Sequence, residues 1–194
     1  MKDTMFLKGR SIFLRPVESA DIPKIASWLN NPKITHFMFY GQLPMNLEQT
    51  GEFVMGQVRS PHNTVFVVCD LKSRKPIGYA GLYDIHLTAH KAEFRVLIGE
   101  QRFWGKGCGT EVTKLLTFYG FDRLNLNKVY LGVVADNQRA VKSYEKSGYV
   151  REGALREEVY RNSRYYDVVK MSILKKEYYK KIYREHLEIF GKEN

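Results

Sequence analysis

Three glycines at alternate positions, Gly105, Gly107 and Gly109, run directly into a segment whose apolar residues have helical spacing. Because glycine adopts positive φ and carries no side chain, a turn of this kind brings backbone N–H groups close to a ligand. The helix that follows offers unpaired N–H groups and the positive end of its dipole to an anion. The sequence therefore predicts that a phosphate, and in particular a pyrophosphate, binds on this turn.

Two familiar phosphate-binding motifs fit this turn poorly. A Walker A loop requires G-x-x-x-x-G-K-S/T, whereas here Gly107 follows Gly105 and Lys106, so the hydroxyl that holds Mg²⁺ is missing. A dinucleotide fingerprint requires G-x-G-x-x-G directly after a strand. Thr110 takes the place of its last glycine, and the polar residues 100–102 separate the glycines from the preceding apolar segment. Neither motif is favoured.

A third interpretation fits the spacing better. Residues 104–109, Trp-Gly-Lys-Gly-Cys-Gly, resemble the acyl-CoA loop Q/R-x-x-G-x-G/A of the GNAT acetyltransferase superfamily, with Trp in the first position. A second segment, 137–149, resembles the N-x-x-A-x-x-x-Y-x-x-x-G-F/Y element of the same superfamily. Two motifs in the expected order are more specific than either alone. The residues that match the second element are Asn137, Ala140, Tyr144, Gly148 and Tyr149.

The resemblance runs from about Leu14 to about Tyr178, which is nearly the whole chain. Within the superfamily the chain looks similar to the group that holds RimJ/RimL-like protein acetyltransferases, spermidine acetyltransferases and nucleotide-amino-sugar acetyltransferases. This resemblance implies an acetyl-CoA-dependent N-acetyltransferase that acts on a primary amine by direct transfer in a ternary complex. No Cys or Ser is paired with a base, which agrees with a reaction that forms no acyl-enzyme.

The resemblance leaves the acceptor open among a protein N-terminal amine, a nucleotide-linked amino sugar and a polyamine. The net charge of +10 disfavours a polyamine, because a polycation should meet acidic walls. Residues 27–32 resemble a segment of amino-sugar acetyltransferases that also occurs in RimL-like proteins, while residues 92–94 resemble the spermidine enzymes. A different class of function is a non-catalytic acyl-CoA-binding module that kept the loop and lost the acceptor chemistry.

The cofactor-binding residues are assigned by position in the resemblance. The pantetheine arm is expected along the main chain of Leu97, Ile98 and Gly99, where a backbone N–H would also stabilise the developing oxyanion. Asn137 is expected to cap the helix that carries Tyr144 and to touch the pantetheine. Trp104 replaces the usual Gln or Arg, so one polar contact is expected to be missing. The residues expected around the pyrophosphate are Arg102, Trp104, Gly105, Lys106, Gly107, Cys108, Gly109 and Thr110.

Glu93 and Tyr144 are the candidate catalytic residues. Acetyl transfer needs a neutral amine, and a positioned carboxylate such as Glu93 can take the proton, often through water. Glu93 matches an acidic position of the RimL-like and spermidine enzymes; alternatively it only orients the substrate or pairs with Arg95, and Asp84 is the reserve base. Tyr144 matches the superfamily tyrosine beside the CoA sulfur, where a phenol can protonate the leaving thiolate. Its alternative role is packing on the core.

The acceptor side, by the same resemblance, is built by the first two helices, the loop between them and the last strands. A ring of aromatic residues is more often core than pocket, so only some of the candidates are expected to touch the substrate. The residues assigned to substrate binding are Trp28, Asn30, Tyr40, Tyr83 and Asp84, and the further candidates are Phe37, Phe39, His86, Tyr160 and Tyr165.

Composition bounds the class of protein. With 194 residues, 44% of them hydrophobic, the chain suits a single domain over residues 1–194 with a basic C-terminal helix at about 175–190. No apolar run approaches ~20 residues, no signal peptide opens the chain, and the two cysteines indicate reduced thiols. We therefore expect a cytoplasmic protein with no membrane partner. Five scattered histidines give no case for a bound metal.

The charge excess favours an anionic ligand. There are 31 basic and 21 acidic residues, and the phosphates of acetyl-CoA account for part of this excess. A nucleic-acid partner would use the tail 175–181, where basic and aromatic residues alternate. We favour a solvated helix there, whose Tyr178, Ile182 and Leu187 touch the body. A homodimer is compatible with the sequence.

The elements that must position these residues follow from the spacing of apolar residues. This spacing predicts the order β-α-α-β-β-β-α-β-α-β-β, an α/β (α+β) arrangement with a mixed, mostly antiparallel sheet flanked by helices. That order is the GNAT topology, in which the fourth strand splays from the fifth. Strands are expected at 11–14, 64–70, 77–85, 92–98, 128–134, 149–155 and 166–174, and helices from Ser19 as N-cap to 29, at 47–58, 110–124 and 138–147.

Overall fold

A mixed eight-stranded sheet forms the centre of the computed structural model, which describes residues 4–161 and 163–190. The strands are β1 (Leu7–Lys8), β2 (Ile12–Pro16), β3 (Thr64–Asp70), β4 (Pro76–His86), β5 (Lys91–Ile98), β6 (Lys128–Val134), β7 (Val150–Arg161) and β8 (Arg164–Leu174). They lie in the order β1-β2-β3-β4-β5-β6-β8-β7. Every neighbouring pair is antiparallel except β5 and β6, which are parallel.

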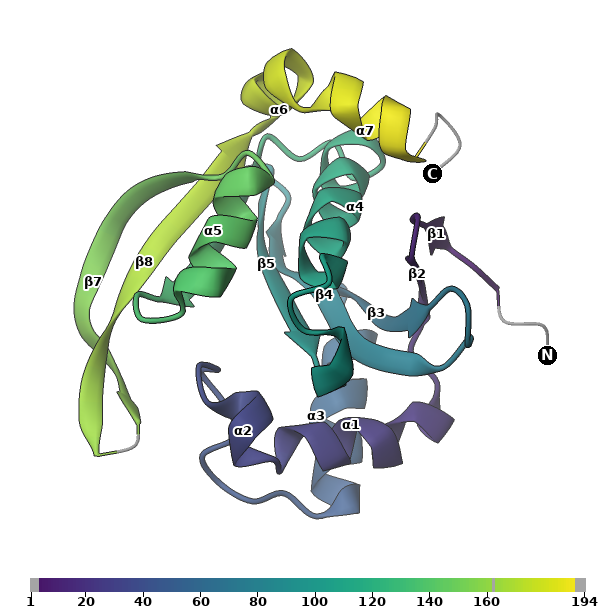
Figure 1. The fold of residues 1–194 in the computed structure, drawn as a ribbon, viewed down its shortest axis with the longest axis vertical. Helices are drawn as coiled ribbons and strands as arrows, with labels where there is room; N and C mark the ends of the chain where they lie inside the picture. Colours follow the sequence, from purple (N-terminus) through teal and green to yellow (C-terminus); the bar gives the residue numbers. More distant parts are fainter. Residues whose placement is uncertain (1–3, 162, 191–194) are drawn as a thin grey trace.

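Helices pack on both faces of this sheet (Figure 1). They are α1 (Ile22–Leu29), α2 (Pro32–Thr35), α3 (Leu47–Arg59), α4 (Cys108–Asp122), α5 (Gln138–Lys146), α6 (Lys175–Lys181) and α7 (Tyr183–Phe190). Because successive strand residues point to opposite faces, β4 contributes to two cores. Leu82 packs with α4 and α5, whereas Tyr79 and Tyr83 pack with α1 and α3.

The predicted fold class and order of elements are confirmed, with additions at both ends of the chain. A short strand, β1, precedes the predicted first strand and pairs with it. The last two strands are longer than predicted and form a hairpin that extends to Arg161 and Arg164. The single C-terminal helix expected at about 175–190 is instead two helices that meet at Ile182.

Two helix starts differ from the prediction. Ser19 does not cap the first helix; Glu18 is the N-cap of a short 3-10 helix over Ser19–Asp21, and Asp21 then precedes α1. The helix after the glycines begins before Thr110, at Cys108. Gly107 is its N-cap and, at a φ of 85°, already holds the turn into the helix.

The helix α2 is absent from the prediction. Pro32 ends the first helix as expected, but it also stands in the first turn of α2, where its fixed φ is favourable. The side chain of Asn31 caps this helix by accepting a hydrogen bond from the backbone N–H of Lys33 at 3.0 Å. Pro32 therefore follows the end of α1 and also begins α2.

The parallel strands β5 and β6 separate soon after they begin. Their pairing runs from Lys91 with Lys128 to Glu93 with Tyr130. Beyond this point β5 continues to Ile98 and β6 to Val134 without pairing to each other. Backbone groups on the facing edges are thus left free of the sheet ladder, as the resemblance implied.

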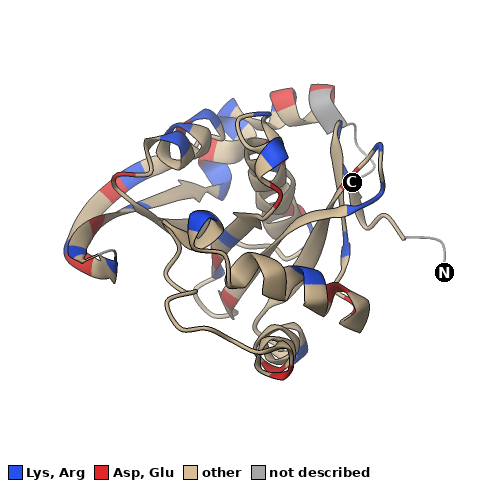
Figure 2. Ribbon diagram, turned by 60° about the horizontal axis from the view of Figure 1, so that its bottom comes forward, with Lys and Arg blue, Asp and Glu red and all other residues tan. Residues whose placement is uncertain are grey.

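The surface charges are spread over the molecule. Lys and Arg lie on many helices and strands, with Asp and Glu interspersed, and no single basic stripe stands out in the view of Figure 2. Within residues 4–161 and 163–190, no helix is long and apolar enough to cross a membrane.

Candidate active site

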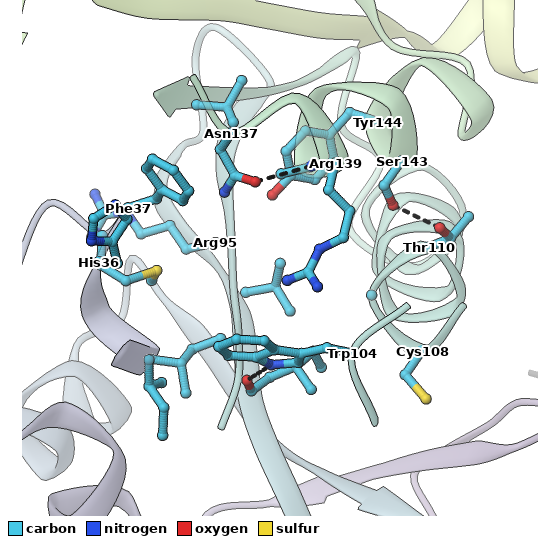
Figure 3. Close-up of a pocket in the computed structure, with 18 of the residues that line it drawn as sticks. His36, Phe37, Arg95, Trp104, Cys108, Thr110, Asn137, Arg139, Ser143 and Tyr144 are labelled. Atoms are coloured by element: carbon cyan, nitrogen blue, oxygen red, sulfur yellow. Dashed lines mark hydrogen bonds between the residues drawn. The ribbon is translucent and has the colours of Figure 1, made fainter. Parts of the chain in front are cut away.

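A cavity of about 1190 Å³ lies where β5 and β6 separate. Its walls come from α2 and the loop that follows, from β5 and β6, from the glycine turn with the start of α4, and from α5. Figure 3 shows His36 and Phe37 on one side, facing Thr110 and Ser143 on the other. The separated strands therefore place two walls, formed by different segments of the chain, around one cavity.

The glycine turn borders this cavity directly. Gly105 and Gly107 have φ values of 75° and 85°, a region that other residues rarely adopt. A Cβ added to either would meet no heavy atom within 4 Å, so both face open space. The backbone N–H groups of the first turn of α4, from Cys108 to Thr110, have no partner within the helix, as at any helix start. Six of the eight residues predicted around the pyrophosphate line the cavity: Trp104, Gly105, Gly107, Cys108, Gly109 and Thr110.

Two of the residues predicted around the pyrophosphate, both cations, do not line the cavity. Arg102 and Lys106 are not among the lining residues; both lie over the ring of Phe103, at 5.0 and 5.9 Å from its centroid. The positive charge on the cavity wall comes from α5 instead. Its cationic lining residues are Arg139, Lys142 and Lys146. Their helical spacing, on the helix that carries Tyr144, is the signal that could have identified them.

Trp104 has a polar contact that the sequence did not predict. Its indole N–H donates to the carbonyl oxygen of Ile98 at 2.7 Å, and the guanidinium of Arg139 lies 4.9 Å from its ring centroid. Figure 3 shows the indole at the base of the cavity with Arg139 above it. Trp104 therefore links the glycine turn to β5, and its ring meets the basic face of α5.

The open edge of β5 carries the backbone of only one of the three predicted residues. The N–H of Gly99 donates to Ile77 in β4 at 2.9 Å, and the carbonyl of Leu97 lies against Gly78 of β4. Because N–H and C=O groups alternate in direction along a strand, the open edge carries those of Ile98 and Val96. Of the three predicted main-chain contacts, only Ile98 has its backbone on that edge.

Asn137 and Tyr144 lie together at one end of the cavity (Figure 3). The side chain of Asn137 caps α5 by accepting from the N–H of Ala140 at 3.2 Å, as expected of this helix start. The ring of Tyr144 packs edge-on against Phe94, with centroids 6.2 Å apart. Burial raises the pKa of Tyr144 above its usual range, so its phenol keeps its proton.

Glu93 is held by an arginine. Its Oε2 atom accepts from Arg95 Nη2 at 2.5 Å and from Nε at 3.0 Å, and the same guanidinium reaches Asp84 at 3.0 Å. Burial lowers the pKa of Arg95, but the hydrogen bond and charge of Glu93 outweigh it and raise the net pKa. Glu93 and Arg95 line the cavity, whereas Asp84 does not. The pairing weighed as an alternative for Glu93 is therefore present, and two carboxylates share one cation.

The predicted acceptor residues divide between core and cavity. Trp28 is core: it is 2% exposed, and a Cβ on Gly99 would collide with its ring. Asn30 lies outside the cavity, where its amide exchanges two hydrogen bonds with the backbone of Met45. Tyr40 lines the cavity, and with Tyr83 it also lines a smaller adjoining one. Phe37 and Phe39 line the main cavity, while His86, Tyr160 and Tyr165 line neither.

The two cysteines do not suggest a nucleophile. Both are buried and neither is in a disulfide, and burial raises the pKa of Cys108 above its usual range. A thiol needs a lowered pKa to be reactive. In the described part of the chain, no group of three or more His, Cys, Asp or Glu residues is arranged to hold a metal ion.

Comparison with known proteins gives consistent matches. A family model described as an acetyltransferase (GNAT) domain matches residues 11–150. The chain is 31% identical to the spermidine N(1)-acetyltransferase of Escherichia coli K12 over 142 residues, 73% of this chain and 74% of that protein. It is 33% identical to the Vibrio cholerae enzyme of the same name over 137 residues, 71% and 78% of the two chains.

Solved structures agree with the sequence matches. The crystal structure of spermidine N-acetyltransferase from Vibrio cholerae in complex with CoA and spermine superposes with a TM-score of 0.80 at 33% identity. The superposition covers 87% of this chain and 98% of the Vibrio cholerae chain. These relatives support the spermidine part of the resemblance and give no support to its RimJ/RimL-like part.

Proposed function

The chain belongs to the GNAT acetyltransferase family and is an acetyl-CoA-dependent N-acetyltransferase, and we propose that Glu93 and Tyr144 carry its proton transfers. The observation that supports this assignment is geometric. The separation of β5 from β6 leaves Glu93, Tyr144 and the glycine turn on the wall of one cavity. A base, an acid and an anion-binding turn can therefore act on the same bound pair of substrates.

The cofactor half of the cavity is assigned to the glycine turn and α5. The N–H groups at the start of α4 would hold the pyrophosphate, and the cations of α5 would neutralise phosphate charge. The backbone groups of Val96 and the N–H of Ile98 would pair with the pantetheine arm, since the carbonyl oxygen of Ile98 already accepts from Trp104. An N–H of this edge would stabilise the oxyanion. Acetyl-CoA supplies the activated acetyl group. Asn137 would touch the arm near the end that carries Tyr144.

Glu93 is assigned the role of general base. Both contacts from Arg95 use Oε2, so Oε1 is the oxygen that would receive the proton of the acceptor ammonium, directly or through one water. The pairing with Arg95 fixes the rotamer of the carboxylate. Asp84, on the same arginine but outside the cavity wall, is the weaker candidate.

Tyr144 is assigned the role of general acid. Its raised pKa keeps the phenol protonated at any pH at which the protein works, so it can donate to the departing thiolate. The edge-on contact with Phe94 fixes the ring, and Asn137 fixes the start of the helix that carries it. A positioned donor of this kind stabilises charge that develops only in the transition state.

A polyamine is the first candidate acceptor. The relatives that act on spermidine support it, and so do two features at the Arg95 end of the cavity. Glu93 and Asp84 together carry one negative charge more than Arg95. The ring of Tyr40, which lines both this cavity and the adjoining one of about 120 Å³, suits an alkylammonium group, whereas the ring of Tyr83 already has the guanidinium of Arg95 at 4.7 Å from its centroid.

A second candidate acceptor is an amine that also carries a negative group, such as a nucleotide-linked amino sugar. Lys33, His36 and Arg95 line the acceptor side, and residues 30–47 contain no Asp or Glu. A polycation would meet few carboxylates along that segment. A diphosphate would meet cations there, so the charge of this wall favours the second class as much as the relatives favour the first.

The test is a panel of amines assayed for release of free CoA thiol from acetyl-CoA. Spermidine, spermine, UDP- and dTDP-amino sugars and N-terminal peptides represent the acceptor classes, and the form of each with all its amines acetylated is its matched control. We expect turnover with at least one class and none with the acetylated controls. Tight CoA binding without turnover of any of these amines would instead identify a non-catalytic acyl-CoA-binding module.

A further inference from the structure

The wall of the cavity on the acceptor side is an irregular segment. Residues 36–46, here called the acceptor loop, connect α2 to α3 and contain no helix or strand. Its first half nevertheless forms much of the cavity wall. The lining residues of the acceptor loop are His36, Phe37, Met38, Phe39 and Tyr40. A wall without regular backbone hydrogen bonds needs anchors from elsewhere to keep one shape.

The strongest of these anchors comes from the far end of the β7–β8 hairpin. Arg161 Nη1 donates to the carbonyl oxygens of Thr35, Met38 at 2.6 Å and Tyr40 at 3.1 Å. In Figure 1 the lower end of this hairpin and α2 lie at the same end of the molecule. The two N–H bonds of one nitrogen are therefore shared among three carbonyls that bracket the lining rings of Phe37 and Phe39.

The environment of Arg161 suits this role and no other evident one. The residue is 9% exposed, and burial lowers the pKa of its guanidinium. Its partners within the described part of the chain are carbonyl oxygens and include no carboxylate. Carbonyls at the end of a helix lack donors within that helix, and a buried cation needs acceptors. The hydrogen bonds between Arg161 and these carbonyls meet both needs.

Two further contacts hold the loop on the same side. The amide of Gln42 donates to the carbonyl of Tyr160, beside Arg161, at 3.0 Å. The ring of Phe39 reaches β6, where a Cβ on Gly132 would lie 3.4 Å from its Cζ atom. The acceptor loop is thus spread between the hairpin and β6, while the glycine turn and α5 take no part in these contacts.

We propose that Arg161 is a positioning residue that sets the shape of the acceptor wall and thereby the affinity for the amine. The inference rests on the proposed function only in assigning this wall to the acceptor. Removing the guanidinium takes this donor from three carbonyls that bracket the lining rings, and leaves Thr35 with only the N–H of Met38. The loop then loses its fixed position and the amine loses its wall. The cofactor wall is built from other segments and keeps its geometry.

The test compares Arg161→Met and Arg161→Lys with Arg156→Met, which changes an exposed arginine of the same strand. Three quantities are measured: the dissociation constant for CoA by calorimetry, amide hydrogen exchange of residues 36–46, and KM for the best amine of the panel. For Arg161→Met we expect faster exchange and an acceptor KM raised about 10-fold or more, with CoA affinity within about twofold of wild type. Arg161→Lys, which keeps the charge but not the fork, should fall between, and Arg156→Met should match wild type.

Other outcomes would count against the role of Arg161. A folded Arg161→Met protein with wild-type exchange in the acceptor loop and unchanged acceptor KM overturns the proposal. If Arg161→Met fails to fold, the Lys variant decides, and wild-type exchange in that variant also overturns it. If wild type turns over no amine, the proposed function has failed separately, and the exchange measurement alone decides whether Arg161 fixes the loop.

Discussion

The two walls of the cavity are built in opposite ways. The cofactor wall consists of short contiguous segments, the glycine turn with α4 and the start of α5, and it offers mainly backbone N–H groups. The acceptor wall is an irregular loop held by Arg161, more than a hundred residues away in sequence. A wall made of local backbone geometry tolerates changes in its side chains but not in its glycines. A wall held by side chains from distant parts of the sequence depends instead on those side chains and not on its glycines.

The largest effect is expected from Gly107→Val in the cofactor wall. The φ of 85° is strained for a β-branched residue, and its side chain would project into the open space beside the turn. We expect CoA affinity to fall by about 100-fold or more, since strain and steric exclusion act together. Gly56→Ala, at an exposed helical position with open space around it, is the control and should bind CoA normally. Wild-type CoA affinity of Gly107→Val by calorimetry would falsify the assignment of the turn.

The next effect concerns Tyr144, the proposed general acid. Tyr144→Phe removes one hydroxyl, and we expect kcat to fall about 100-fold, the scale of a lost general acid, with CoA affinity unchanged. Tyr149→Phe is the matched control, because its ring lies 6.1 Å from that of Tyr144 and its hydroxyl bonds Thr117 at 2.8 Å instead of lining the cavity. The control should lose stability and keep kcat. Equal kcat values for Tyr144→Phe and wild type would remove Tyr144 from the mechanism.

The sequence predicts the backbone geometry of the glycine turn and the cap of α5, because these requirements are local. Gly105 and Gly107 carry positive φ, and Asn137 caps its own helix, so each residue type follows from the backbone beside it. The direction of β5 backbone groups depends on the register with β4, which sequence spacing does not give. For that reason Leu97 and Gly99 were assigned in place of Val96.

The acceptor wall could not be predicted for a physical reason. A tryptophan or tyrosine is suited equally to a core and to a pocket, so Trp28 was assigned to the substrate although it packs under Gly99. Arg161 gave no signal, because a lone arginine in a strand shows nothing of the three carbonyls it will meet. The order of strands and helices is set by periodicity, which explains why the fold was predicted while this wall was not.

A smaller and pH-dependent effect is expected from Glu93→Gln on the acceptor side. If Glu93 removes the ammonium proton, the loss in kcat/KM should be about 10- to 100-fold near pH 7. The loss should shrink as the pH approaches the pKa of the free amine, about 10, because a neutral amine needs no base. Asp84→Asn, which removes the other carboxylate on Arg95, is the control and should show no such pH dependence. A defect that is constant with pH would mean that Glu93 orients the amine and does not deprotonate it.

The smallest effect is expected at Trp104, whose side chain links the glycine turn to β5. Trp104→Phe keeps an aromatic ring beside Arg139 and removes the hydrogen bond to Ile98, whereas Trp104→Gln keeps a donor for that carbonyl and removes the ring. A net hydrogen bond contributes about 1 kcal/mol, so we expect Trp104→Phe to weaken CoA binding about fivefold and Trp104→Gln to bind nearly as wild type. The opposite ranking in calorimetry would show that stacking with Arg139 matters more than the link to β5. In that case even the cofactor wall depends on a contact between distant segments, and the contrast with the acceptor wall is one of degree.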